Sequence, residues 1–302
     1  MKILVTGSEG TLGKPLVNKL RECGHDVYCT DLFHTADPLF MRSDVAIYRQ
    51  IERVIKIFRP EMVYHFAAEF GRVNGEEYFE QLWTSNVIGT RNMLELCSMY
   101  NIKLVFASSS EAYGELDVPV MEETMIGDRF LDHHNDYAVT KWVNEGQIRR
   151  FAKYNKLEAM TCRFFNSYGV EGYTPYRSVV CLFCYRILKG LPITIYKDYH
   201  RVFMYLDDFI DTMSRIPERF VAGEVLNIGG TEYRSIEELV SIIENISGKK
   251  ANVTIIPREK ANVTNKKPSI EKAFRLLGHN PKTVLEDGVK LTLDWIKETY
   301  SL

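Results

Sequence analysis

The chain has 302 residues, and its 38 lysines and arginines against 40 aspartates and glutamates leave a net charge of −2. This balance excludes a strongly basic nucleic-acid-binding protein. No apolar run approaches the ~18 residues that a membrane-spanning helix needs. With 45% hydrophobic residues, the chain can bury a large core, as two domains or as one large α/β unit.

The six cysteines are scattered through apolar segments. Cys181 and Cys184 form a Cys-x-x-Cys pair, but a structural zinc ion needs four ligands, and the surrounding apolar stretch predicts a buried helix. We therefore expect reduced, buried thiols and no metal site. Because a strand pattern begins at Lys2, the sequence leaves no room for a signal peptide, and we expect a cytoplasmic protein.

The first half of the chain alternates short apolar runs with stretches of helical periodicity. We expect strands at residues 2–6, 26–30, 61–66, 103–107 and 158–163, and helices at residues 11–23, 48–58, 78–100 and 136–154. Strands that alternate with helices predict an α/β fold with a doubly wound parallel sheet of the Rossmann type.

The pattern loosens after Asn166. A loop rich in tyrosine and glycine precedes the apolar helix, and then come short strands and helices that include a strand at residues 193–196 and a long last helix at residues 285–300. We expect a first domain at residues 1–166, with a return segment near residues 201–222. A smaller C-terminal α/β lobe should occupy mainly residues 167–302.

A glycine-rich loop lies between the first strand and the first helix. Gly7 allows a tight turn, Gly10 lets backbone N–H groups approach a pyrophosphate, and Gly13 lets the helix pack on the strand. Asp31 ends the second strand, where an acid would hold the adenosine ribose hydroxyls of a dinucleotide. Asp44, before the next helix, could accept a hydrogen bond from the adenine amino group, although a solvated surface acid fits it nearly as well.

A tyrosine and a lysine stand four residues apart near the start of the helix predicted at residues 136–154. This spacing places Tyr137 and Lys141 on one face, where the ammonium would lower the tyrosine pKa from about 10. The serine-rich loop at residues 108–114 follows the fourth strand. Such a loop opens onto the cofactor crevice of a parallel sheet, where a hydroxyl can bind the same substrate oxygen.

In this order, these motifs resemble those of the extended short-chain dehydrogenases/reductases, in the nucleotide-sugar epimerase and dehydratase branch, and the resemblance covers essentially the whole chain. Gly7, Gly10 and Gly13 match its Gly-x-x-Gly-x-x-Gly loop, and Ser109, Tyr137 and Lys141 match its catalytic triad. The resemblance implies an NAD-dependent enzyme. It also implies that Thr11, Leu12 and Ala67 contact the dinucleotide, with Tyr137 and Lys141 beside them.

Three residues are candidates for binding the nucleotide sugar. Asn166 and Arg201 lie in segments that resemble the sugar-nucleotide-binding segments of the family, and Arg72 follows the segment that should lie over the sugar. Val170 stands where the family usually has proline, and Ser269 where many members have aspartate. These departures leave the nucleotide and the sugar open.

The chemistry that the resemblance implies passes through a 4-keto sugar. Tyr137 removes the proton of the sugar 4-hydroxyl while the C4 hydride moves to NAD, Ser109 aligns the oxygen, and Lys141 favours the phenolate. Glu111 is two residues beyond Ser109. If the backbone stays extended there, both side chains share a face, and Glu111 is placed to remove a C5 proton.

Three other readings stay open from the sequence. One is a UDP-glucuronate decarboxylase, and another is a plain 4-epimerase that needs no C5 base. A third, from a different class, is a non-catalytic regulator that senses the dinucleotide; the intact Ser109, Tyr137 and Lys141 argue against it.

Two further expectations concern the cofactor and the assembly. Asp31 would repel the 2′-phosphate of NADP, so we expect NAD. The resemblance implies a homodimer in which the helices at residues 77–100 and 136–154 pair across a two-fold axis. Met93, Leu94, Leu96 and Cys97 give the first helix apolar area beyond a single stripe, although burial in the monomer explains that almost as well.

Overall fold

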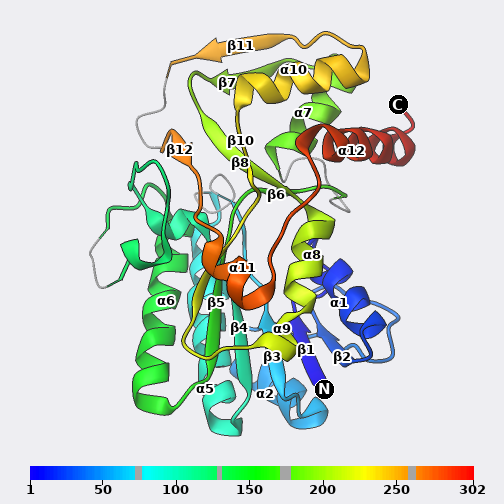
Figure 1. Cartoon of the computed structure of the whole chain (residues 1–302). Coiled ribbons are helices and arrows are strands. Elements are labelled where there is room, and N and C mark those ends of the chain that lie inside the picture. Colours follow the sequence, from blue (N-terminus) through cyan, green and yellow to red (C-terminus); the bar gives the residue numbers. More distant parts are fainter. Residues whose placement is uncertain (72–76, 128–130, 171–177, 258–262) are drawn as a thin grey trace. The chain divides into compact units, whose positions relative to one another are not determined.

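The structure is a computed structural model that describes residues 1–71, 77–127, 131–170, 178–257 and 263–302 (Figure 1). It contains two compact units. The first comprises Met1–Gly114, Ile126–Arg163 and Ile210–Leu226, and the second comprises Glu115–Met125, Phe164–Phe209 and Asn227–Leu302.

The first unit is built on a six-stranded sheet with the strand order β2-β1-β3-β4-β5-β9. The strands are β1 (Lys2–Thr6), β2 (Asp26–Thr30), β3 (Met62–His65), β4 (Lys103–Ser109), β5 (Ala159–Phe164) and β9 (Val225–Ile228), the last two of which run to the boundary of the unit. The pairs β1–β2, β1–β3 and β3–β4 are parallel. The central strands read as unbroken apolar runs because both faces of a doubly wound sheet are covered by helices.

The helices of the first unit differ in what they bury. They are α1 (Gly13–Glu22), α2 (Tyr48–Phe58), α4 (Phe79–Trp83), α5 (Gly89–Tyr100), α6 (Asp136–Asn155) and α9 (Ile216–Arg219). In α1, Leu16, Val17 and Leu20 are buried, as their spacing predicts. The buried residues of α1 are mostly apolar, whereas those of α6 include Lys141, Asn144 and Glu145. Helix α8 (Leu206–Ser214) crosses the boundary between the units.

The helix expected at residues 78–100 is not one continuous α-helix. Between α4 and α5, the segment η1 (Thr84–Ile88) is a π-helical turn. A π turn frees backbone carbonyls from the regular ladder, so other groups must bind them. The amide of Asn144 on α6 donates to the carbonyl of Asn86 over 2.9 Å, and the amide of Gln147 donates to the carbonyl of Val87 over 3.4 Å.

The second unit contains two small sheets. One has the order β10-β8-β12 with β6 paired to β8, and the other pairs β7 with β11. The strands are β6 (Ser167–Tyr168), β7 (Ile193–Tyr196), β8 (His200–Tyr205), β10 (Glu232–Ser235), β11 (Val253–Ile256) and β12 (Asn265–Lys266). The helices are α7 (Val179–Leu188), α10 (Ile236–Ser247), α11 (Glu271–Leu277) and α12 (Leu285–Tyr300).

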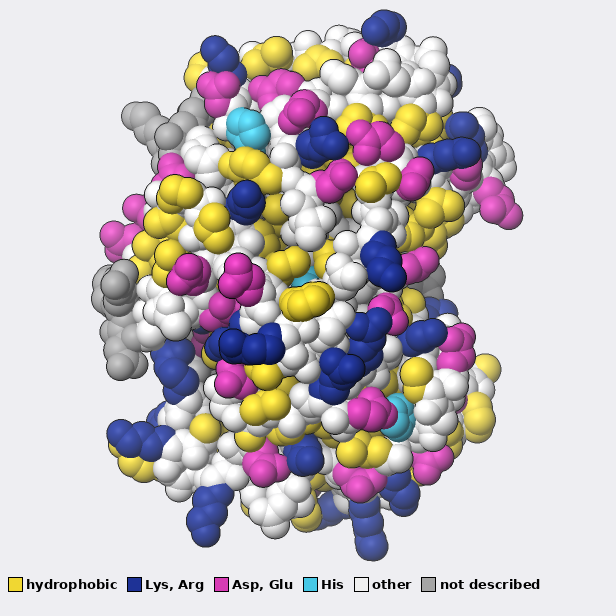
Figure 2. Space-filling view, viewed as in Figure 1, with side chains coloured by type: hydrophobic (Ala, Val, Ile, Leu, Met, Phe, Trp, Pro, Cys, Tyr) yellow, Lys and Arg dark blue, Asp and Glu magenta, His cyan; other side chains and the backbone are white. Residues whose placement is uncertain are grey.

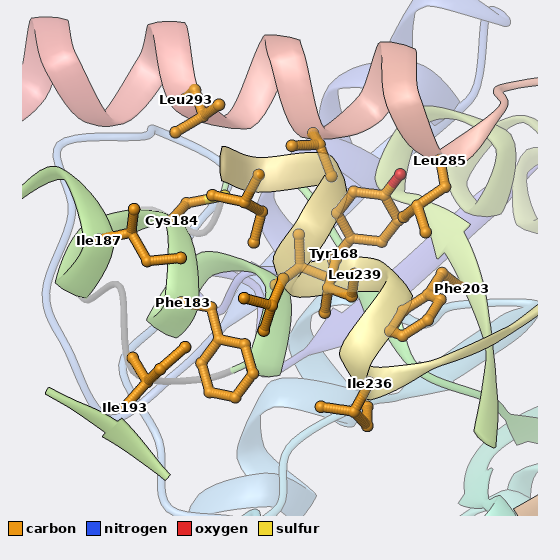
Figure 3. Close-up of a cluster of buried hydrophobic side chains, with 14 of the residues drawn as sticks. Tyr168, Phe183, Cys184, Ile187, Ile193, Phe203, Ile236, Leu239, Leu285 and Leu293 are labelled. Atoms are coloured by element: carbon orange, nitrogen blue, oxygen red, sulfur yellow. The ribbon is translucent and has the colours of Figure 1, made fainter. Parts of the chain in front are cut away.

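Helices α7, α10 and α12 enclose the apolar core of the second unit (Figure 3). Phe183 on α7, Leu239 on α10 and Leu293 on α12 meet there. Cys184 points into this core, and the thiol of Cys181 donates to the carbonyl of Gly169 over 3.1 Å. The Cys-x-x-Cys pair therefore lies in a buried helix, as the apolar pattern predicts.

Further observations concern the surface charge, the thiols, membrane-spanning helices and metal ligands. Acidic and basic side chains are interspersed on the face shown in Figure 2. All six cysteines are free thiols, and five of them are buried. Among the described residues, no helix is long and apolar enough to cross a membrane, and no group of three or more His, Cys, Asp or Glu side chains could hold a metal ion.

Candidate active site

The glycine-rich loop leaves no room for a side chain at Gly7 or Gly13. Gly7 has a φ of +70°, and a Cβ there would lie 2.7 Å from the backbone nitrogen of Ala67. A Cβ on Gly13 would lie 2.1 Å from the carbonyl oxygen of Gly7. The loop is thus a tight backbone cradle that ends at the N-terminus of α1, which favours a bound phosphate.

Asp31 is held in place by backbone groups. Its carboxylate accepts hydrogen bonds from the N–H groups of Glu9 over 3.0 Å, Leu32 over 2.7 Å and Phe33 over 3.3 Å. Two cations of α1, Arg21 and Lys19, form ion pairs with other carboxylates: Arg21 pairs with Asp37 at 2.6 Å, and Lys19 pairs with Glu22 at 3.4 Å. A carboxylate fixed at the end of β2 suits ribose hydroxyls and opposes a 2′-phosphate.

Hydrogen bonds to neighbouring segments position Asp44 and Ala67. Asp44 accepts a hydrogen bond from the N–H of Ala46 over 2.8 Å, so its carboxylate shapes the turn before α2. The N–H of Ala67 donates to the hydroxyl of Thr6 over 3.1 Å, which fixes the segment after β3 against the glycine loop. A contact of either residue with a dinucleotide stays a prediction.

Tyr137 and Lys141 share one face of α6, as their spacing predicts. The Lys141 ammonium lies 5.6 Å from the centre of the Tyr137 ring and donates to the carbonyl of Ala107 over 2.8 Å. Lys141 is only 4% exposed, and burial lowers its pKa to about 8, while the Glu145 carboxylate acts in the opposite direction. This is a cation placed to favour a phenolate.

The serine-rich loop differs from the expectation in one respect. Ser109 ends β4 in an extended conformation, but the next residues form a 3₁₀ turn, η2 (Ser110–Tyr113). The hydroxyl of Ser109 caps this turn by accepting from the N–H of Glu111 over 3.1 Å. The premise that the chain stays extended from Ser109 to Glu111 is therefore wrong, because serine is a strong capping residue and begins a turn here. The two residues are linked by a hydrogen bond instead.

Two further features support the site, and the second of them was not predicted from the sequence. Asn86 accepts from the N–H of Glu69 over 2.8 Å and donates to the carbonyl of Glu69 over 3.0 Å, so it fixes the backbone that leads toward Arg72. Arg72 itself lies outside the described residues. The second feature is a buried ion pair between Glu145 and Arg163. Its only signal in the sequence is that Glu145 follows Lys141 by four residues, on the same helix face.

Asn166 and Arg201 lie in the second unit. The side-chain nitrogen of Asn166 is buried and has no hydrogen-bond partner among the described residues. The guanidinium of Arg201 is 9% exposed and donates to the backbone carbonyls of His200, Val263 and Thr264 over 2.8 to 3.0 Å. Asn166 thus offers an open donor, whereas Arg201 already secures the backbone around β8.

Residues 3–229 match the family described as the NAD dependent epimerase/dehydratase family. The chain belongs to this family. The glycine cradle and the fixed Asp31 carboxylate fit the phosphates and the ribose of a dinucleotide. Membership confirms the Rossmann fold, NAD as the cofactor and an enzyme of the epimerase/dehydratase type.

Relatives of this family member cover its whole length. A UDP-N-acetyl-alpha-D-glucosaminuronate decarboxylase from Bacillus cytotoxicus is 27% identical over 98% of both chains. The UDP-glucose 4-epimerase of Thermotoga maritima, solved with UDP-glucose, is 29% identical with a TM-score of 0.91 and covers 99% of this chain and 100% of its own. The UDP-glucuronic acid 4-epimerase of Bacillus cereus, solved with UDP-glucuronic acid and NAD, is 27% identical with a TM-score of 0.88 over 99% and 100%.

Proposed function

We propose that the protein converts a nucleotide sugar through a 4-keto sugar, with Ser109, Tyr137 and Lys141 as catalytic residues and Glu111 as the base at C5. The observation that carries the proposal is the buried Lys141 ammonium beside the Tyr137 ring. A buried cation favours the phenolate, which is the form that accepts a proton from a sugar hydroxyl.

Each of the proposed catalytic residues has a separate role in this chemistry. NAD, held at the glycine-rich loop and Asp31, would supply the acceptor for the C4 hydride. Tyr137 accepts the proton of the 4-hydroxyl and gives it back, and Ser109 hydrogen-bonds the same oxygen. Lys141 stays protonated and stabilises the phenolate.

Glu111 supplies a carboxylate next to Ser109. The 4-ketone lowers the barrier to losing the C5 proton, and a carboxylate in this loop suits that step. A C5 base serves a dehydratase or an epimerase at C5, whereas a plain 4-epimerase needs none.

Two alternatives draw support from the comparisons. Relatives include a uronate decarboxylase and UDP-sugar 4-epimerases, so a UDP-glucuronate decarboxylase and a plain 4-epimerase remain alternative reactions for the same site. The non-catalytic sensor has no such support.

We propose three residues for binding the nucleotide sugar. The buried amide of Asn166 has an open donor, which suits an oxygen of the substrate. We assign Arg201 and Arg72 to the nucleotide and the sugar, with Arg201 also holding the backbone at Val263 and Thr264.

We also propose a homodimer that works in the cytoplasm. Met93, Leu94, Leu96 and Cys97 lie in the core of the first unit, so they do not supply the paired surface. Other apolar side chains on this stretch are open, with Phe79 53% exposed and Ile88 50% exposed. Helices α5 and α6 lie side by side (Figure 1), as a paired face would need. The six cysteines form no disulfide, which suits a reducing compartment.

The test combines a binding screen with product analysis. UDP-, dTDP-, GDP- and CDP-sugars are screened by thermal shift, because a ligand at ~100 times its Kd adds ~2.7 kcal/mol of stability. The best ligand is then turned over in D₂O. We expect deuterium at C5 of the product with the native chain and none with Glu111→Gln.

Other outcomes distinguish the alternatives. Product without C5 exchange and an unaffected Glu111→Gln variant would leave a plain 4-epimerase. Release of carbon dioxide from UDP-glucuronate would identify the decarboxylase. Failure of every nucleotide sugar to stabilise or react would contradict the proposal as a whole.

A further inference from the structure

A buried ion pair lies directly behind the proposed catalytic pair. Glu145 and Arg163 are each 2% exposed, and they meet in a bidentate arrangement with Nε–Oε1 and Nη2–Oε2 distances of 3.0 and 2.8 Å. Replacing such a pair with apolar side chains often costs a protein no stability. Stability alone therefore gives no reason for charges at this position.

The ion pair is connected to both parts of the chain that carry proposed catalytic residues, helix α6 and the loop after β4. Tyr137, Lys141 and Glu145 recur every four residues on α6, so they follow one face of the helix. The carboxylate of Glu145 also accepts from the hydroxyl of Ser108 over 2.6 Å, and Ser108 precedes Ser109. Arg163 donates to the Tyr113 hydroxyl over 3.1 Å at the end of η2.

We infer that Glu145 and Arg163 are positioning residues that set the charge around Lys141 and Tyr137, with the carboxylate and the guanidinium balancing each other so that Lys141 is left as the net positive charge beside Tyr137. This inference rests on the proposed function, since it assumes that Tyr137 works as a phenolate beside the Lys141 cation. It does not depend on which nucleotide sugar is the substrate.

The groups that β3 and β4 place around Lys141 are uncharged, so they do not set the charge there. Among the described residues, β4 presents the carbonyl of Ala107 and the ring of Phe106, and neither titrates. His65 from β3 lies between the hydroxyls of Thr6 and Thr90, and burial, together with the Lys141 charge, lowers its pKa to about 3, so it stays neutral. The charge nearest to Lys141 on its own helix face is then that of Glu145, with Arg163 behind it. Two further carboxylates belong to α6 and to η2, which packs against it: Asp136, which accepts from the indole N–H of Trp83 over 3.2 Å, and Glu111. Every variant compared below keeps both of them.

The sign of the effect distinguishes charge setting from mere packing. Removing the carboxylate leaves extra positive charge, which favours proton loss from Tyr137 at lower pH. Removing the guanidinium does the reverse. Eight residues of helix separate Tyr137 from Glu145 by about 12 Å. At an effective dielectric of ~20, a unit charge at that distance shifts a pKa by about one unit.

The experiment titrates Tyr137 in the NAD-bound protein through the ultraviolet absorbance of its phenolate. The chain has 17 tyrosines, so each variant is compared with the same variant that also carries Tyr137→Phe. We expect the titration of Glu145→Gln to move about one pH unit down and that of Arg163→Gln about one unit up. The double variant should titrate within ~0.3 units of the native protein, and so should Ser108→Ala, which changes no charge.

Equal or same-direction shifts in the two single variants would overturn the inference. If a single variant does not fold, the double variant still tests the inference. A shift of more than ~0.5 pH units in its Tyr137 titration would contradict charge balance. The pH profile of turnover with UDP-glucuronate is the second readout. Absence of turnover by the native protein with every nucleotide sugar counts against the proposed function, whereas the phenolate titration judges the ion pair independently.

Discussion

The two ends of the site in the first unit are built by different means. At the proposed phosphate end, Gly7 and Gly13 form a tight backbone loop, and a side chain at either position would collide with the backbone. At the proposed catalytic end, Lys141, Glu145 and Arg163 are buried charges, and Glu145 and Arg163 form an ion pair. The first end therefore depends on the absence of side chains, and the second on the balance of charges.

The largest expected effect comes from the catalytic end. Tyr137→Phe removes the only proposed acceptor for the 4-hydroxyl proton and keeps the packing of the ring. We expect turnover to fall by roughly 10²–10⁴-fold. NAD affinity, measured by calorimetry, should stay within about threefold. Turnover within about twofold of the native protein would show that another base acts.

The phosphate end is tested by Gly13→Ala. Its Cβ would lie 2.1 Å from the carbonyl oxygen of Gly7, so the loop must shift. Overpacking of this kind costs roughly 1–3 kcal/mol, and we expect NAD affinity to fall at least tenfold. Gly146→Ala is the matched control, because its Cβ meets its nearest neighbour, Arg149, at 3.9 Å. Unchanged NAD affinity in Gly13→Ala would contradict the backbone cradle.

Asp31→Asn tests the one charge at the phosphate end. The amide keeps the size of the side chain but removes the repulsion of a 2′-phosphate. We expect the preference for NAD over NADP to narrow by on the order of tenfold. Calorimetry with both dinucleotides measures it. Equal affinity of the native protein for the two would contradict the role of Asp31.

The smallest effect concerns the π turn. Asn144→Leu leaves the buried carbonyl of Asn86 without its side-chain donor, which costs about 1–3 kcal/mol in the free energy of unfolding. Gln147→Ala is the control, since its bond is longer, at 3.4 Å, and less buried. Chemical denaturation compares the two variants. Equal losses would mean that α6 does not specifically support the turn.

The features that the sequence predicts well are those set by residues close together in the chain. The strand, glycine loop and helix at the N-terminus follow from residues within 20 positions of one another, and the Tyr137–Lys141 face follows from helical spacing. The features that were missed depend on distant partners. The π turn is bonded by Asn144, 58 residues beyond Asn86, and Arg163 meets Glu145 from another element. The turn at Glu111 was missed because the Ser109 hydroxyl competes with extended backbone for its N–H.

The most direct measurement follows the C4 hydrogen of the substrate. The nucleotide sugar identified by the screen is prepared with deuterium at C4 and converted in ordinary water. A 4-keto route in which the hydride leaves and returns predicts that the deuterium stays in the product, at C4 for an epimerase or a decarboxylase and at C6 for a dehydratase, with conversion strongly reduced in Tyr137→Phe. Loss of the deuterium to solvent, or equal conversion by Tyr137→Phe, would contradict this route.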